Sequence, residues 1–209
     1  FGVRALAHTP TGELLVGDEF GALYCYDTAD PDRPVGRIDL GRAITSIAVG
    51  GDGTVVAGTA DGFVAAFIEA LATDPAGAGP ACDPSDWTRI DLGTSTETVT
   101  SVALLANGGL ALIGTDGGTV ELWDVSRRRQ IGTLATAARD HPAVAAGSPD
   151  GSTIAVGADT FIELYQLDRD DLRRRLCDIA DRELTADERA AFLPDPDTHA
   201  IARCSAEPS

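Results

Sequence analysis

The chain has 209 residues and a formal net charge of −17, from 33 acidic and 16 basic residues. This charge repels phosphate backbones, whose binding needs basic side chains that displace counterions, so we expect no nucleic acid as a partner. A hydrophobic content of 44% is typical of a globular protein, and no apolar run approaches the roughly 20 residues of a membrane span, so we expect no membrane as a partner either.

The first 41 residues predict four short strands in succession. The runs VRALA, ELLVG and ALYCY are separated by polar turns that contain Gly or Asp, and the segment PVGRIDLG follows them. Short β-branched or aliphatic runs bounded by such turns are typical of strands joined in hairpins. The sequence therefore predicts an antiparallel sheet of four strands in this first unit.

The same pattern returns three times along the chain. In each copy an aromatic residue lies five positions after a turn residue, and these aromatics are Tyr26, Phe67, Trp123 and Tyr165. A glycine precedes the aromatic by nine positions in three copies and by eight in the fourth, at Gly17, Gly58, Gly114 and Gly157. A period of about 40 to 45 residues with four strands is that of a propeller blade.

We therefore predict an all-β fold of four β-propeller blades at about residues 1–41, 42–93, 94–135 and 136–168. The pentapeptide RIDLG, at Arg37 to Gly41 and at Arg89 to Gly93, is predicted to be the outer strand of its blade. The fourth blade lacks a segment for an outer strand. Residues 69–86, rich in Gly, Pro and Asp, lengthen the second unit and are predicted to form a surface loop.

Residues 169–209 predict a helical C-terminal tail. Leu172, Leu176, Ile179 and Leu184 follow one another at helical spacing, with charged residues between them. Thr185 and Glu188 fit a capping box that begins a second helix, and Pro194 would end it.

The repeated units resemble WD repeats, most clearly from Val99 to Asp124, where Trp123 and Asp124 keep the literal WD dipeptide. The resemblance covers roughly residues 1 to 168 and implies a WD-repeat β-propeller. The Gly-His pair that commonly precedes the first strand is absent. His141 lies near that position without its glycine.

The tail resembles that of WD-repeat proteins in actinobacteria, many of them STAND-type ATPases or kinases. The resemblance is carried by Cys177, Ile179, Leu184-Thr185, the Phe-Leu-Pro segment at residues 192–194 and Cys204. It implies a bacterial signalling protein whose catalytic domain lies upstream of Phe1.

The four cysteines are Cys25, Cys82, Cys177 and Cys204. They are too few and too scattered for a secreted disulfide scaffold, so we expect a reducing compartment and a cytoplasmic protein. Cys177 and Cys204 could pair or bind a metal, but buried thiols are the simpler expectation, because no further ligands stand near them.

The sequence offers no catalytic site, cofactor site or metal site. Propeller enzymes such as calcium-dependent lactonases hold a metal with carboxylates and amides from their innermost strands. The predicted first strands VRALA, ITSIAV, VTSVALL and AVAAG carry none of these groups. No nucleophile elbow, Walker loop or His-Glu-x-x-His motif occurs.

A binding surface remains, formed by the turns between second and third strands and by the junctions between blades. The candidate partner-binding residues are Asp18, Glu19, Phe20, Arg42, Asp61, Glu97 and Asp116. Phe20 is an aromatic residue in an otherwise polar turn, as in many binding hot spots. Asp61 and Asp116 have a structural alternative, because each can bridge its own turn.

We expect a protein-binding scaffold or sensor module of a larger signalling protein, with no chemistry of its own. The alternatives are a propeller enzyme of hydrolase or lactonase type with its site outside this chain, and a purely structural stalk. Because each blade buries its faces against two neighbours, we expect missing blades upstream of Phe1, most simply completing a ring of seven. A second copy, a partner chain or the tail could instead cover the open ends.

Overall fold

The computed structural model describes residues 2–68, 87–105, 108–136, 140–148 and 150–167. The chain divides into two units, Phe1–Tyr165 and Gln166–Ser209. The strands belong to the first unit, except that Gln166, the last residue of the final strand, is the first residue of the second unit. The predicted loop at 69–86 and the predicted helices of the tail lie outside the described residues.

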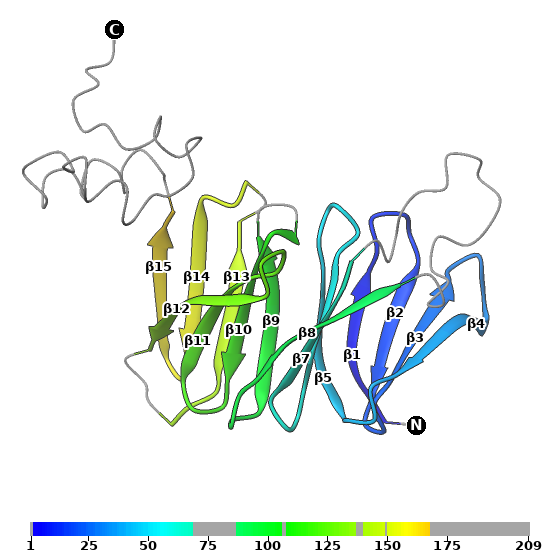
Figure 1. Cartoon of the computed structure of the whole chain (residues 1–209), viewed down its shortest axis with the longest axis horizontal. Helices are drawn as coiled ribbons and strands as arrows, with labels where there is room; N and C mark the ends of the chain where they lie inside the picture. The colour runs from blue at the N-terminus through cyan, green and yellow to red at the C-terminus, as the bar shows by residue number, and fades with distance from the viewer. Residues whose placement is uncertain (1, 69–86, 106–107, 137–139, 149, 168–209) are drawn as a thin grey trace, which may run out of the picture. The chain divides into compact units, whose positions relative to one another are not determined.

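Within the described residues, fifteen strands form four antiparallel sheets in chain order, and Figure 1 shows their arrangement. Blade 1 contains β1 (Val3–His8), β2 (Leu14–Asp18), β3 (Ala22–Asp27) and β4 (Asp30–Asp39). Blade 2 contains β5 (Ile44–Val49), β6 (Val55–Thr59), β7 (Phe63–Ile68) and β8 (Thr88–Thr94). Blade 3 contains β9 (Val99–Leu105), β10 (Leu110–Thr115), β11 (Thr119–Asp124) and β12 (Arg129–Ala135). Blade 4 contains β13 (Ala143–Gly147), β14 (Thr153–Ala158) and β15 (Phe161–Gln166).

This architecture confirms the predicted fold class. Each strand pairs with its sequence neighbour, and the first and last strands form the two edges of each blade. The RIDLG segments contribute to the edge strands β4 and β8, as predicted. Among the described residues the sheet of blade 4 has three strands and no fourth.

The repeated pentapeptide forms the same ion pair and buries the same leucine in both copies. Its Arg and Asp lie two positions apart, so both side chains point to the same face of the strand. They form an ion pair in each case, with N–O distances of 3.1 Å between Arg37 and Asp39 and 2.8 Å between Arg89 and Asp91. The leucine that follows, Leu40 or Leu92, is buried.

Successive blades pack through two buried apolar clusters. The first cluster joins blades 1 and 2 and includes Leu15, Leu23, Ile44 and Phe67. The second cluster joins blades 2 and 3 and includes Val56, Val64, Val99, Val102 and Ile113. The first strands β1, β5, β9 and β13 also contact one another in order along the chain.

The repeated glycines of the second strands lie where the next blade makes its closest approach. A Cβ built on Gly17 would lie 2.5 Å from Ile44 Cγ2, and one on Gly58 would lie 2.3 Å from Val99 Cγ1. A Cβ on Gly114 would lie 2.3 Å from the carbonyl oxygen of Ala143. Since real Cβ atoms do not approach so closely, glycine at these positions lets the blades meet.

Serine hydroxyls link two of the three joints. Ser46 Oγ accepts a hydrogen bond of 2.9 Å from the amide of Val102, and Ser101 Oγ accepts one of 3.1 Å from the amide of Ala145. Blade 1 has Ala5 at the corresponding position, opposite Gly17 as Ser46 is opposite Gly58. The joint between blades 1 and 2 therefore has no such hydroxyl link.

Cys25 is fully buried on β3 and is disulfide-bonded. A structural disulfide was not predicted, because the spacing of four scattered cysteines does not reveal which side chains the fold brings together. The expectation of buried thiols concerned Cys177 and Cys204, which lie outside the described residues.

Candidate partner-binding surface

The candidate surface is a set of turns and junctions at one end of the blades, which we call the turn rim. It comprises residues 18–21, 60–62 and 116–118 in the turns and residues 40–43 and 95–98 in the junctions. Each turn accepts a backbone hydrogen bond from the junction that follows its blade. The donors are Leu40 to Gly21 at 2.8 Å, Ser95 to Gly62 at 2.9 Å and Thr136 to Gly118 at 3.1 Å.

Glycine closes these turns for a backbone reason. Gly21 and Gly62 have φ values of 95° and 82°, a conformation that L side chains rarely adopt. A Cβ on Gly21 would also lie 2.3 Å from the backbone nitrogen of Arg42. Each turn is therefore held against its junction, and the side chains around it are presented from a fixed backbone.

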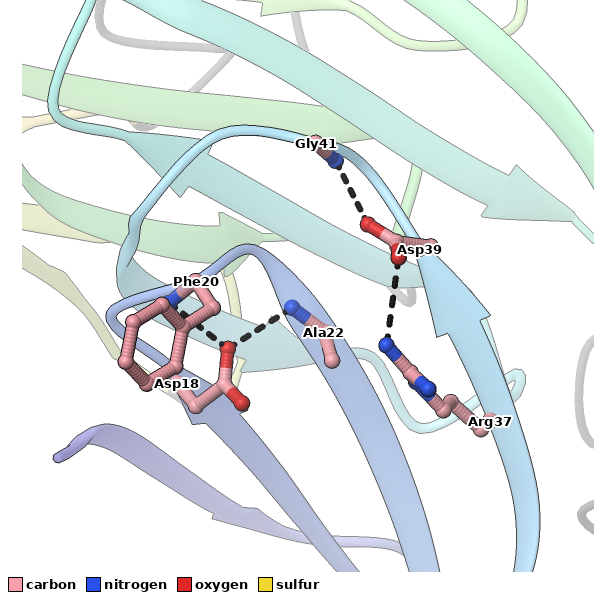
Figure 2. A network of polar contacts seen from close by, with 6 residues as sticks. All are labelled: Asp18, Phe20, Ala22, Arg37, Asp39 and Gly41. Atoms are coloured by element: carbon pink, nitrogen blue, oxygen red, sulfur yellow. Dashed lines mark hydrogen bonds and ion pairs between the residues drawn. The ribbon is translucent and has the colours of Figure 1, made fainter. Parts of the chain in front are cut away.

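Asp18 has a structural role in the first turn (Figure 2). Its carboxylate is buried and accepts hydrogen bonds from the amides of Phe20, at 2.9 Å, and Ala22, at 2.8 Å. Both bonds go to the same oxygen, Oδ1. Asp18 thus fixes the turn that carries Phe20 and does not itself face a partner.

Phe20 projects from this turn with 69% of its surface exposed. Its neighbour Glu19 is half-buried, lies 3.9 Å from Arg4 in an ion pair, and donates its backbone amide to the carbonyl of Gly2 at 3.0 Å. A large apolar side chain on an ordered polar turn is the most prominent binding feature that the rim presents.

Arg42 and Asp61 are brought together, although the sequence analysis did not pair them. Arg42 donates to Asp61 Oδ2 at 2.7 Å, and its guanidinium carbon lies 4.7 Å from the centroid of the Phe63 ring. The pKa of Asp61 is lowered, chiefly by the hydrogen bond from Thr59 Oγ1 and further by the charge of Arg42. Because both partners are exposed, this pair orders the rim more than it stabilises the fold.

Glu97 and Asp116 belong to the turn of blade 3. Glu97 accepts a hydrogen bond of 2.5 Å from Thr115 Oγ1, and Asp116 accepts one of 3.0 Å from the amide of Thr98. Asp116 bridges its turn to the junction before β9, and Asp61 accepts from Thr59 within its own turn. The structural alternative, a bridge within its own turn, therefore describes Asp61, whereas the carboxylate of Asp116 links its turn to the junction.

A second set of polar contacts, at the edge of blade 1 near the first turn, was not predicted from the sequence. Figure 2 shows Asp39 accepting from the amide of Gly41, at 2.8 Å, and from Arg37, at 3.1 Å. The repeated RID tripeptide was the available signal, since a charge pair two positions apart recurs in it. This network orders the junction that carries Arg42.

Two further features of the described residues concern metal ions and membranes. No group of three or more His, Cys, Asp or Glu side chains there could hold a metal ion. No helix in the described part of the chain is long and apolar enough to cross a membrane.

Comparison with known proteins identifies the architecture. Residues 89–124, from β8 to β11, match the family model described as WD domain, G-beta repeat. The β-propeller domain of Cps50 (Swd1) from Myceliophteria thermophila is similar in structure, with a TM-score of 0.60 and 15% sequence identity. The match covers 78% of this chain and 51% of that one. No curated protein matches the sequence.

These findings support a WD-repeat β-propeller, as the resemblance of the repeats implied. The chain spans about half the length of the propeller domain that it matches. The resemblance of the tail to ATPases and kinases stays a prediction.

Proposed function

We propose that this chain is a protein-interaction module that binds its partner through the turn rim. WD-repeat propellers generally serve as interaction scaffolds. The observation that carries the proposal is the exposure of Phe20 on a turn that the buried Asp18 carboxylate holds in place.

The rim suits a partner that brings an apolar pocket to Phe20. An aromatic side chain that is already held by an ordered backbone loses little conformational freedom on binding. The nearby carboxylates of Glu19 and Asp61 each have an arginine neighbour, so this part of the rim is not a single-sign electrostatic patch. We expect Phe20 to supply most of the affinity and the charged side chains to set the orientation.

The proposal extends to the setting of the module. In it, further blades upstream of Phe1 complete a propeller of a larger bacterial signalling protein, and catalysis resides in another domain. The proposed location is the cytoplasm. The disulfide at Cys25 is the observation that weighs against this location, because structural disulfides are rare in reducing compartments.

A photo-crosslinking amino acid at position 20 tests the binding role in the host cell. We expect one discrete adduct, which an excess of wild-type chain competes away and an excess of the Phe20→Ala chain does not. Position 11 is the control, because Thr11 is also exposed but lies in the turn between β1 and β2, at the other end of the strands. Equal adducts at both positions, or equal competition by both chains, would refute the proposal.

A further inference from the structure

The two end blades expose faces that are buried in every internal blade. On blade 1, Val3 and Leu6 are 54% and 60% exposed. The residues in the same register on blade 2 are Ile44 and Ile47, and those on blade 3 are Val99 and Val102. All four of these equivalents are at most 8% exposed. We call the face of blade 1 that carries Val3, Leu6 and Tyr26 the leading face.

Blade 4 exposes the face that, in blades 1 to 3, packs against the next blade. Ile162 is 77% exposed, whereas its equivalents Leu23, Val64 and Val120 are at most 4% exposed. Leu164 and Val144, at 67% and 53%, lie on the same face by strand alternation and by the pairing of Val144 with Gly157. We call the face that carries Val144, Gly157, Ile162 and Leu164 the trailing face.

At Gly157 the trailing face has space that no other blade fills among the described residues. A Cβ built there would meet only Val144 Cγ2 at 3.3 Å and the carbonyl oxygen of Phe161 at 3.8 Å, both in its own blade. The equivalent glycines of blades 1 to 3 each face an atom of the next blade at 2.5 Å or less. The fourth blade thus keeps the repeated glycine, with its space open among the described residues.

We infer that the trailing face of one chain receives the leading face of a second copy, so that Val3 lies over Gly157 as Ile44 lies over Gly17 and Val99 over Gly58. The occupant follows from continuity with the three internal joints, because this chain carries both halves of the joint that they repeat. Each half presents aliphatic side chains. Gly157 supplies the room that a β-branched residue of a first strand, Ile44 or Val99, fills at the first two internal joints.

A contact between two different faces is heterologous, and it closes when two copies satisfy both joints at once. The closed pair would hold eight blades, which is within the range of about four to eight that propellers adopt. This assembly is the alternative to completion of the ring by blades upstream of Phe1, and it leaves the turn rim, on which the proposed binding role rests, accessible. In a longer chain, further blades would compete for the same two faces.

Sedimentation of the 209-residue chain between about 1 and 100 µM, a range in which interfaces of modest affinity become populated, tests the inference. We expect a monomer-dimer equilibrium for the wild type. Leu6→Asp on the leading face and Ile162→Asp on the trailing face should each be monomeric. Ile131→Asp is the matched control, because Ile131 is a 46% exposed aliphatic residue on β12, away from both end faces, and this variant should associate as the wild type does.

Mixing the two monomeric variants separates this joint from other contacts. The trailing face of Leu6→Asp and the leading face of Ile162→Asp are intact, so the mixture should form a one-to-one complex. A symmetric contact between two trailing faces would instead leave Leu6→Asp dimeric and would overturn the inference. A wild type that stays monomeric throughout would overturn it too.

If the wild type is monomeric, a shortened chain tests whether the trailing face is covered by the C-terminal residues. A chain that ends at residue 167 and associates, where the full chain does not, would show that residues after 167 cover the trailing face. Each of these outcomes is independent of the cross-linking at position 20. Failure of the joint therefore leaves the proposed binding role standing, and the reverse also holds.

Discussion

Val99 fills the space that a side chain at Gly58 would need, since a Cβ on Gly58 would lie 2.3 Å from Val99 Cγ1. Gly58→Ala should therefore force blades 2 and 3 apart and destabilise the fold by about 1–3 kcal/mol, the usual cost of overpacking a core. Urea unfolding measures the change. Gly132→Ala is the control, because Gly132 also lies in a strand but has no atom within 4 Å of the added Cβ. Equal losses in the two variants would contradict the close approach at this joint.

Asp18→Ala should destabilise the chain by about 1–3 kcal/mol, because it leaves the buried amide of Ala22 and the amide of Phe20 without their acceptor. Asp18→Asn keeps one oxygen acceptor and should recover part of the loss. Thermal unfolding followed by circular dichroism compares the three proteins. If Asp18→Ala has the same melting temperature as the wild type, the carboxylate does not hold the turn.

The carboxyl of Asp124 predicts a dependence of stability on acid. Hydrogen bonds from the side chain and the backbone amide of Arg127 and from Ser126 lower the pKa of Asp124 to about 2. Because the folded state favours the ionised form, this stabilisation is present above the ordinary pKa and is lost as the pH falls from about 4 toward 2.

Asp124→Asn should be less stable than the wild type at pH 7 and should lose less stability over that acid interval. Chemical denaturation at a series of pH values measures both quantities. Parallel curves for the two proteins would show that Asp124 is not the group responsible. Asp150, whose pKa is likewise lowered to about 2 through Ser148 and Ser152, contributes in the same interval and remains unchanged in the variant.

Reduction should lower the melting temperature, since a disulfide typically contributes about 2–4 kcal/mol of stability. The Cys25→Ala variant should melt lower than the oxidised wild type and should be insensitive to reductant. Peptide mapping under non-reducing conditions identifies the second cysteine of the bond. A wild type whose melting temperature does not respond to reductant would contradict the bond at Cys25.

The periodic part of the fold could be predicted from the sequence because the repeat marks the same structural positions in each blade. Gly17, Gly58 and Gly114 recur in register because one packing requirement recurs at each joint. Side-chain contacts between residues that are distant in the sequence have no such repeated pattern. Arg42 and Asp61 are 19 positions apart and lie in different segments of the rim, and the exposure of Phe20 depends on how the turn closes over Asp18.

The end faces could not be predicted as distinct, for a related reason. Ile162 and Val64 occupy equivalent positions and have equally apolar side chains, and they differ only in whether a further blade covers them. An alignment of the repeats would, however, have shown that Ser46 and Ser101 occupy equivalent positions, since each follows a threonine in the segments ITS and VTS.

The glycine joint also makes blades interchangeable during evolution. Ile44 and Val99 differ in size, yet each packs on a glycine of the same register. A gene duplication of the segment from Ile44 to Thr98, which includes the junction, would therefore insert a blade whose first strand fits the preceding glycine and whose own glycine fits the following strand. Because each blade contacts only its neighbours, such an insertion would leave the packing at the other internal joints unchanged. Repeat number in this protein can thus change by whole units, while substitution within a unit is constrained at the glycine.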